Sequence, residues 1–201
     1  SMDHARPTPI PLRILGTGEY VPSRCISSAE FDQRWHKPEG WTRRHVGIDH
    51  RYFAGPDETG SLMAAHAAQE ALRTAGLGAG QIDAIISVAG VPEQAIPCTA
   101  VLVQRRLGLA GSSIPAFDIN ATCLGFLVAL DLVASAMATG RFRRVLLVAG
   151  EVASAGLDPD EAGATDVIGA SLDHLIGSWT AAEAREFDDA VAVFEKIDEE
   201  I

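Results

Sequence analysis

The stretch IPAFDINATCLGFLVALDLVASAMATG, residues 114–140, decides the fold of this chain because it predicts a strand followed by a helix. Its first six residues form a short apolar run of strand length. From Leu124 onward, apolar residues recur too densely to occupy one face only, which predicts a helix buried nearly all round. Cys123 lies at the junction, and we expect it in the first turn of that helix.

The position of Cys123 favours thiol chemistry. Unpaired backbone N–H groups and the positive end of the helix dipole stabilise an anion at a helix N-terminus, so a thiol there readily becomes a thiolate. The small neighbours Ala121 and Gly125 leave room for a substrate carbonyl, and the backbone N–H of Cys123 can serve as an oxyanion donor. Free cysteines are also often small core residues, which is the alternative for Cys123 and the expectation for Cys25 and Cys98.

The composition is that of one globular domain. The chain has 201 residues, of which 47% are hydrophobic and 21% charged, enough for a sizeable core. Residues 1–11 are polar and Pro-rich, which predicts a disordered arm rather than a signal peptide. The sequence has no apolar run of membrane-spanning length, and this predicts a cytoplasmic protein. Three cysteines without paired spacing or a His/Cys cluster predict neither a disulfide framework nor a metal site.

The net charge of −11 is concentrated at one end of the chain. Residues 157–201 hold 13 acidic residues against two basic ones, whereas residues 1–156 hold 14 of each sign. We therefore divide the chain into a neutral domain, residues 12–156, and an acidic tail, residues 157–201. An acidic tail makes nucleic acid an unsuitable partner and a basic protein surface a suitable one.

The tail predicts an amphipathic acidic helix over residues 180–200. Thr180 and Glu183 fit a capping box, and apolar residues follow at helical spacing. These are Ala184, Phe187, Ala190, Val191, Phe194 and Ile197. Their apolar stripe has to dock on the domain or on a partner chain. The segment also resembles the toxin-binding helix of small antitoxin proteins.

The remaining elements alternate between strand and helix. Strands are predicted at residues 12–21, 82–91 and 143–150, and helices at 57–76 and 99–107. This order predicts an α/β fold with a mostly parallel sheet covered by helices on both faces. Gly16 and Gly18 lack the third glycine and the helix of a nucleotide-binding turn, so we expect no such site. We expect His66, on the apolar face of its helix, to be packed rather than to act as a base.

Residues 118–126, Asp-Ile-Asn-Ala-Thr-Cys-Leu-Gly-Phe, resemble the nucleophile segment of the β-ketoacyl-acyl-carrier-protein synthase III family in the thiolase superfamily, which has the pattern Asp-x-x-x-x-Cys-x-Gly-Phe. The order of the other motifs follows the family over residues 12–153, the N-terminal of its two similar halves. The resemblance implies a thiolase-like layered sandwich and an acyltransferase without a bound cofactor. The resemblance also implies that Cys123 accepts an acyl group from a coenzyme A or acyl-carrier-protein thioester. That acyl group would then condense with a malonyl thioester, as in fatty acid or polyketide biosynthesis.

Residues 41–48, WTRRHVGI, resemble a second family segment, Trp-Ile-x-x-Arg-Thr-Gly-Ile, whose Trp and Arg sandwich the adenine of coenzyme A. The resemblance implies substrate-binding roles for Trp41, Arg44 and His45. Here His45 occupies the Arg position, and Arg44 lies one residue earlier, so a carrier-protein thioester is the alternative donor. An interfacial Trp41 covered by Arg side chains is the alternative without a substrate.

The family's condensing His and Asn lie in the half that this chain does not match, and the sequence contains no His-x-x-Asn. We therefore expect acylation without condensation from this chain alone. A truncated or altered gene product, a deliberately isolated half, or one chain of a split enzyme whose second chain supplies the missing half would each explain this pattern. The family dimerises through the strand before the nucleophile, which implies a homodimer through residues 115–120. Its first half ends with Phe-Gly-Asp-Gly-Ala-Ala-Ala entering a last strand, for which residues 166–171 are a weak candidate.

A different class of function is also compatible with these features. The chain could be a non-catalytic thiolase-fold scaffold, or a protein-binding module that recruits a partner through the acidic C-terminal helix. The reactivity of Cys123 distinguishes this alternative from the acyltransferase.

Overall fold

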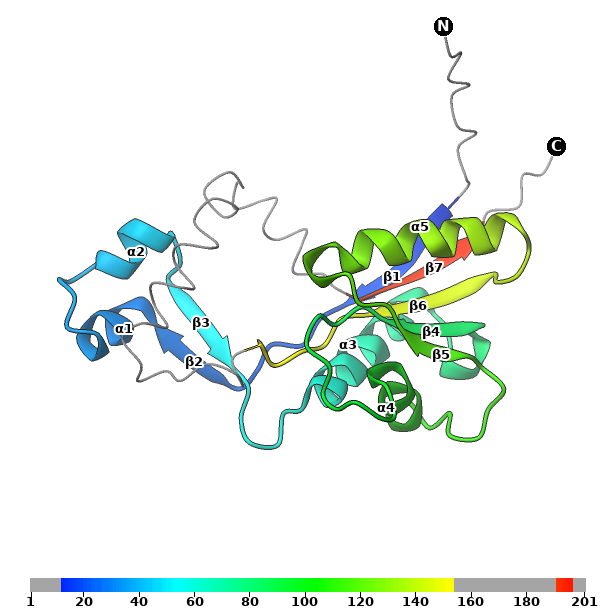
Figure 1. The fold of residues 1–201 in the computed structure, drawn as a ribbon, viewed down its shortest axis with the longest axis horizontal. Helices are drawn as coiled ribbons and strands as arrows, with labels where there is room; N and C mark the ends of the chain where they lie inside the picture. Colours follow the sequence, from blue (N-terminus) through cyan, green and yellow to red (C-terminus); the bar gives the residue numbers. More distant parts are fainter. Residues whose placement is uncertain (1–11, 154–190, 197–201) are drawn as a thin grey trace, which may run out of the picture.

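The computed structural model of the chain describes residues 12–153 and the backbone of residues 191–196 (Figure 1). A mixed five-stranded sheet lies between helices, and a smaller lobe of two helices and two strands extends from one end. Within these residues, none of the helices has the length and apolar character needed to cross a membrane.

The main sheet has the strand order β1-β7-β6-β4-β5. Its strands are β1 (Leu12–Gly18), β4 (Ala84–Ser87), β5 (Ala116–Asp118), β6 (Arg144–Val148) and β7 (Val191–Lys196). β4 pairs in parallel with both β5 and β6, whereas β7 runs antiparallel to its neighbours β1 and β6. In the register, Ser87 pairs with Asp118 on one side and with Val148 on the other. The carboxyl ends of the three parallel strands therefore lie level at one edge of the sheet.

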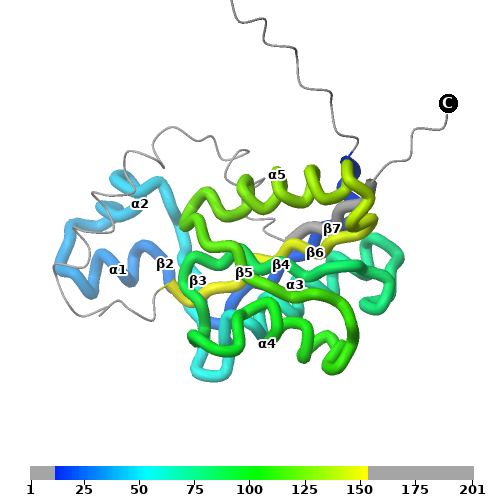
Figure 2. Tube along the Cα trace, turned by 45° about the vertical axis from the view of Figure 1, so that its right-hand side comes forward, coloured from blue at the N-terminus to red at the C-terminus, as the bar shows by residue number. Residues whose placement is uncertain are grey.

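Helices cover both faces of this sheet (Figures 1 and 2). α3 (Gly60–Ala75) and α4 (Thr99–Arg106) pack on one face with Ile85 and Leu146, and α5 (Gly125–Ala138) packs on the other. β4 and β6 are buried on both faces, as expected of the central strands of a covered parallel sheet.

Helix α3 confirms the helix predicted at residues 57–76, although it begins three residues later, at Gly60. Thr59 is the N-cap and accepts a hydrogen bond from the Leu62 N–H at 3.4 Å, and Gly76 ends the helix with a φ of 68°. A short 3-10 helix, η1 (Ala79–Gln81), follows. His66, however, is exposed and stacks on the Tyr20 ring at a centroid distance of 5.3 Å, so the expectation that it is packed was wrong.

The two glycines of β1 have a packing role. A Cβ on Gly16 or Gly18 would overlap the backbone carbonyls of Ala71 and Ala67, respectively. Glycine at both positions therefore lets β1 lie directly against the backbone of α3. This packing is a reason for the two glycines that does not involve a nucleotide.

Helix α5 is less buried than its composition predicts. Gly125, Ala129, Val133 and Met137, spaced four residues apart, face the sheet and are buried. Apolar residues on its other side are exposed, namely Leu124 (59%), Leu127 (55%), Val128 (38%) and Leu132 (50%). Among the described residues, α5 packs against one sheet only, so the prediction of burial all round was wrong. We call Leu124, Leu127, Val128 and Leu132 the apolar face of α5.

The predicted helix over residues 180–200 was wrong for residues 191–196. These residues form β7, which lies between β1 and β6 and pairs with both. The run Val-Ala-Val-Phe is rich in residues that favour strands. Between β1 and β6, its backbone pairs with the edges of both neighbouring strands. The rest of the predicted helix, the strand candidate at residues 166–171 and the predicted arm at residues 1–11 lie outside the described residues.

The smaller lobe pairs two short strands with two short helices. These are β2 (Arg24–Ser27), α1 (Ser28–Arg34), α2 (Trp41–Val46) and β3 (His50–Phe53). The buried Asp32 carboxylate accepts hydrogen bonds from the N–H and hydroxyl of the buried Thr42 at 2.8 and 2.7 Å. These bonds hold α1 against α2, and the Thr42 hydroxyl is the largest cause of the lowered pKa of Asp32.

Glu58 ties the chain entering the lobe to the chain leaving it. Its carboxylate accepts hydrogen bonds from the Tyr20 hydroxyl at 2.6 Å, the Gly55 N–H at 2.6 Å, and the N–H and hydroxyl of Ser23 at 3.0 and 2.9 Å. These donors, the Tyr20 hydroxyl foremost, lower the pKa of Glu58 to about 2.

The lowered pKa makes the contribution of Glu58 to stability dependent on pH. Because the folded-state pKa of about 2 lies below the ordinary value of 4.5, the stabilisation is present above pH 4.5 and is lost as the pH falls toward 2. We expect Glu58→Gln to lower the urea midpoint at pH 7, and the difference from wild type to shrink between pH 5 and pH 2. Asp57→Asn, at the exposed neighbouring carboxylate, is the control; a Glu58→Gln deficit that is constant with pH would contradict this assignment.

Candidate active site

Three loops meet where the parallel strands end. Residues 88–98 follow β4, residues 119–124 follow β5, and residues 149–151 follow β6. In open α/β sheets, ligands bind outside the carboxyl ends of the strands, where such loops converge. Cys123 lies in the loop that follows β5.

Cys123 sits in a tight turn directly before α5. The 3-10 helix η2 (Thr122–Leu124) contains it, and the Leu124 N–H closes the turn on the Ala121 carbonyl at 3.1 Å. The cysteine is therefore immediately before the first turn of α5 rather than in it. Its side chain is exposed, so the alternative of a small core residue was wrong.

The other two cysteines differ from each other. Cys25 is exposed on β2, which contradicts the expectation that it belongs to the core. Cys98 is half-buried beside the core at the start of α4, in partial agreement with that expectation.

Gly125 allows α5 to begin at the end of β4. A Cβ at this position would lie 2.9 Å from the Val88 carbonyl oxygen and 3.4 Å from the Val88 Cβ. The first distance is shorter than an ordinary carbon–oxygen contact, so a larger residue would push the start of the helix away from the sheet. Glycine after Cys-x in this motif thus fixes the position of Cys123 against β4.

Asp118 connects β5 to α4. Its carboxylate accepts hydrogen bonds from the backbone N–H groups of Thr99 and Ala100 at 2.9 and 2.8 Å. A carboxylate is favoured at a helix N-terminus, where these N–H groups have no partner within the helix. The acidic residue that opens the nucleophile motif therefore anchors the strand that leads to Cys123.

Two side chains that the sequence pattern did not reveal hold the loops together. The Asn120 side-chain amide donates to the Gly90 carbonyl at 3.1 Å, and the Glu151 carboxylate accepts from the Val91 N–H at 2.8 Å. Each bond crosses between loops that are far apart in the sequence. Only a general signal pointed to Asn120, namely that asparagine is common in turns.

A charged network supports the loop after β4 from the other side. Glu93 accepts the Ser61 N–H at 2.8 Å, and the Arg106 guanidinium donates to the Ser61 hydroxyl at 2.9 Å. Burial favours the neutral form of Glu93, but the bonds from Ser61 and Thr59 and the charge of Arg106 outweigh it and lower the pKa of Glu93.

In the smaller lobe, the structure brings Trp41 and His45 together. Their rings stack with centroids 4.3 Å apart, and His45 Nδ1–H donates to the Trp41 carbonyl at 2.8 Å. Arg44 donates to the Glu39 carbonyl instead, while Lys37 Nζ lies 4.9 Å from the Trp41 ring centroid. A base between the two rings would need a separation of about 7 Å, two contacts of about 3.5 Å each. The slot between Trp41 and His45 is therefore closed in this structure.

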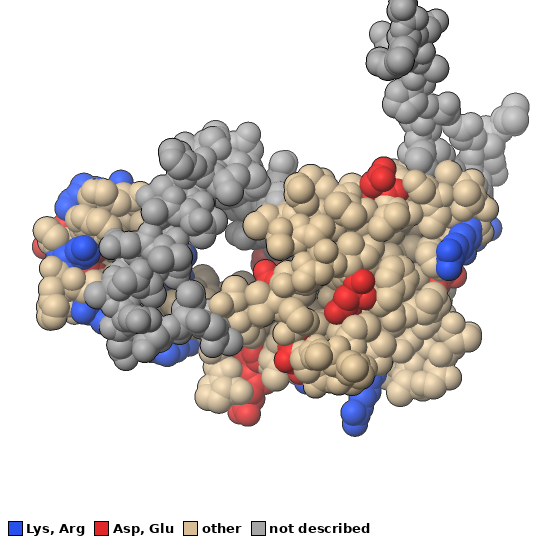
Figure 3. All heavy atoms as spheres, in the orientation of Figure 1, with Lys and Arg blue, Asp and Glu red and all other residues tan. Residues whose placement is uncertain are grey.

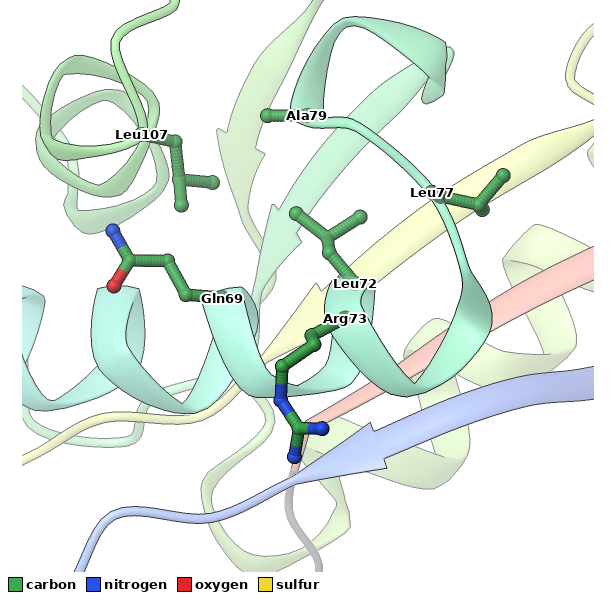
Figure 4. Close-up of a pocket in the computed structure, with 6 residues that line it drawn as sticks. All are labelled: Gln69, Leu72, Arg73, Leu77, Ala79 and Leu107. Carbon is green, nitrogen blue, oxygen red and sulfur yellow. The ribbon is translucent and has the colours of Figure 1, made fainter.

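A pocket of about 240 Å³ lies on the face of the sheet opposite α5 (Figure 4). It is lined by Gln69, Leu72, Arg73, Leu77, Ala79 and Leu107. These residues belong to α3, the segment after it and the end of α4, so the pocket is separate from Cys123. Across residues 12–153 and 191–196, no group of three His, Cys, Asp or Glu side chains could hold a metal ion.

Comparison with known proteins points to one family. The model of the 3-oxoacyl-[acyl-carrier-protein] synthase III family matches residues 117–170. β-Ketoacyl-[acyl-carrier-protein] synthase III of Laribacter hongkongensis is 37% identical over 149 residues, which cover 74% of this chain and 46% of that protein. The enzyme of the same name from Rhodobacter capsulatus is 35% identical over 85% of this chain and 53% of its own length. The chain spans about half the length of the curated relatives that it matches.

Solved structures give the same result. The Aquifex aeolicus 3-oxoacyl-[acyl-carrier-protein] synthase III has a TM-score of 0.72 and 29% identity, covering 94% of this chain and 55% of its own. The priming β-ketosynthase of the R1128 polyketide pathway has a TM-score of 0.73 and 28% identity, covering 97% and 53%. The predicted thiolase-like fold class and the partial resemblance to this family are confirmed.

The contact of Gly125 with Val88 predicts the effect of adding one methyl group. Gly125→Ala should displace the start of α5 and lower the free energy of unfolding by about 1–3 kcal/mol, measured by urea denaturation. Gly80→Ala is the control, since a Cβ there meets nothing within 4 Å, and its effect should stay within about 0.5 kcal/mol. Equal effects of the two substitutions would show that Gly125 is not under this constraint.

Proposed function

Because the chain is related to the β-ketoacyl-acyl-carrier-protein synthase III family over about half of that family's length, we propose that it is the nucleophile-bearing half of an acyltransferase of this type. The observation that carries the proposal is the exposed Cys123 in the turn before α5, at the carboxyl edge of the parallel sheet and inside the segment that the family model matches.

Cys123 is the acyl acceptor in this proposal. Its sulfur attacks the thioester carbonyl, the new carbon–sulfur bond forms, and the donor's thiol leaves with the proton that Cys123 loses. The Cys123 backbone N–H stabilises the negative charge that develops on the carbonyl oxygen. The exposure of Cys123 supports access by a thioester, and no bound cofactor or metal is part of the step.

Condensation with a malonyl thioester requires groups that this chain does not supply. We propose that a second chain with the complementary half provides the His and Asn and covers the apolar face of α5. Figure 3 shows few charged side chains over this part of the molecule. Burying a leucine side chain completely contributes about 1.5–3 kcal/mol, so covering these partly exposed residues would strongly favour such a partner.

For the donor, we propose a carrier-protein thioester in preference to coenzyme A. The closed stack of His45 on Trp41 supports this choice because it occupies the ring face that an adenine would need. Trp41, Arg44 and His45 would then contact the carrier protein from outside, together with Lys37, and the positive charges of Arg44 and Lys37 suit an acidic partner.

We also propose a homodimer through residues 115–120. β5 is the last strand of the sheet among residues 12–153 and 191–196, and the edge that faces away from β4 could pair with a second copy. Phe117 on this strand is 39% exposed.

A non-catalytic scaffold is the second candidate function. The exposed apolar face of α5 favours it, since the face suits a partner whether or not Cys123 reacts. The version that recruits a partner through a C-terminal helix is weakened, because residues 191–196 form a strand of the sheet.

The first test measures acyl transfer to the purified chain. Incubation with acetyl or medium-chain thioesters should increase the intact mass by one acyl group, and Cys123→Ala should abolish the increase. Addition of malonyl thioester should give no 3-oxoacyl product. An absent mass increase would favour the scaffold, and a condensation product from this chain alone would refute the need for a second chain.

The second test concerns the donor. Wild type should be acylated faster by acyl-carrier protein than by the matching acyl-coenzyme A, and His45→Ala should raise the coenzyme A rate by about tenfold by opening the Trp41 ring face. His36→Ala, an exposed histidine elsewhere in the lobe, should leave both rates unchanged. If His45→Ala leaves the coenzyme A rate at the wild-type value, the stack does not select the donor.

A further inference from the structure

Thr122, the residue before Cys123, has an unusual backbone conformation. Its φ is 51°, in the left-handed region that β-branched residues rarely adopt. Such a conformation persists only where surrounding contacts enforce it, and it occurs most often at functional sites. The contacts that hold Thr122 therefore bear on Cys123.

Asn120 supplies these contacts in two directions. Its side-chain oxygen accepts the Thr122 N–H at 3.0 Å, and its side-chain nitrogen donates to the Gly90 carbonyl at 3.1 Å. One amide thus connects the turn of the nucleophile to the loop after β4, thirty residues earlier in the chain.

The Gly90 end of this connection is itself fixed. The Glu151 carboxylate accepts the N–H of the next residue, Val91, at 2.8 Å. A Cβ on Gly90 would lie 3.6 Å from the Thr122 Cα and 3.4 Å from a Glu151 carboxylate oxygen, so the three loops are packed against one another here. Asn120 therefore holds Thr122 against the loop after β4, and Glu151 in turn holds that loop.

We infer that Asn120 is a positioning residue for Cys123. The inference rests on the proposed function, in which Cys123 accepts an acyl group. Because Thr122 directly precedes Cys123, its backbone conformation sets the directions of the Cys123 N–H and side chain. By holding Thr122 in the left-handed conformation, Asn120 aims both groups at the same thioester carbonyl.

The inference predicts a difference between two reactions of the same thiol. Acyl transfer needs the sulfur and the oxyanion donor aligned on one carbonyl, and misplacement of either is costly. Alkylation by iodoacetamide needs only an accessible sulfur. Loss of Asn120 should therefore slow acylation and leave alkylation nearly unchanged, whereas general unfolding would change both rates.

The experiment uses the full chain with Cys25→Ser and Cys98→Ser, so that Cys123 is the only thiol. Asn120→Ala should lower the rate of acylation by an acyl thioester by about tenfold or more, with the iodoacetamide rate within about twofold of the parent. Gln94→Ala is the matched control, because this carboxamide also bonds within the loop after β4, to the Ile96 carbonyl at 2.8 Å, without contacting the nucleophile turn. It should change neither rate.

A second-site variant tests the mechanism. Glycine adopts a positive φ without steric cost, so Thr122→Gly added to Asn120→Ala should recover acylation by about threefold or more. Unchanged acylation in Asn120→Ala, or parallel loss of acylation and alkylation, would overturn the inference.

Hydrogen exchange separates failure of this inference from failure of the proposed function. If the parent chain accepts no acyl group, the proposed function fails. The Asn120 contact is then read from the Thr122 amide, which should exchange about tenfold faster in Asn120→Ala and at the parent rate in Gln94→Ala. An unchanged Thr122 exchange rate in Asn120→Ala would show that Asn120 does not hold this turn.

Discussion

The contact between Gly125 and the Val88 carbonyl is the constraint on which the rest of the site depends. It lets α5 begin directly on the end of β4, and so it places the turn with Cys123 at the level carboxyl ends of the parallel strands. Asp118 fixes the strand that enters this turn, and Asn120 fixes the turn against the neighbouring loop. The position of Cys123 thus follows from backbone packing and from the contacts of Asp118 and Asn120, all within this chain.

The same geometry bears on the proposed partner. α5 has one face seated on the sheet and an apolar face that nothing covers among the described residues. The relatives extend beyond the part that this chain matches, since the chain covers 46% of the Laribacter hongkongensis protein and 55% of the Aquifex aeolicus protein. The nucleophile turn and the partly uncovered α5 are the two features expected of an acyl acceptor that needs a partner for the remaining chemistry. The catalytic proposal and the binding proposal are therefore compatible.

Local sequence signals predicted much of the fold and the position of Cys123. Thr59 and Gly76 bound α3 because caps act within one turn, and the nucleophile motif marked the junction before α5. Burial of α5 could not be predicted, because composition does not show how many layers a chain provides. β7 was missed because Val191 and Phe194 fit helical spacing while Val191 and Val193 fit strand spacing, and pairing with β1 and β6 decides between them. Residues 187–193, Phe-Asp-Asp-Ala-Val-Ala-Val, keep the Phe, the Asp and one Ala of the family's Phe-Gly-Asp-Gly-Ala-Ala-Ala, which was the available signal.

The central claim is that the site at the strand ends makes Cys123 an acyl acceptor, and a second cysteine of the chain serves as an internal control for it. Cys25 is also exposed, but it lies on β2 in the smaller lobe, away from α5. The decisive measurement is the distribution of acyl label between the Cys123 and Cys25 peptides after brief incubation of the wild-type chain with an acyl thioester. The account predicts that Cys123 is labelled about tenfold faster or more. Equal labelling of the two cysteines would contradict it, because exposure alone would then explain the reaction.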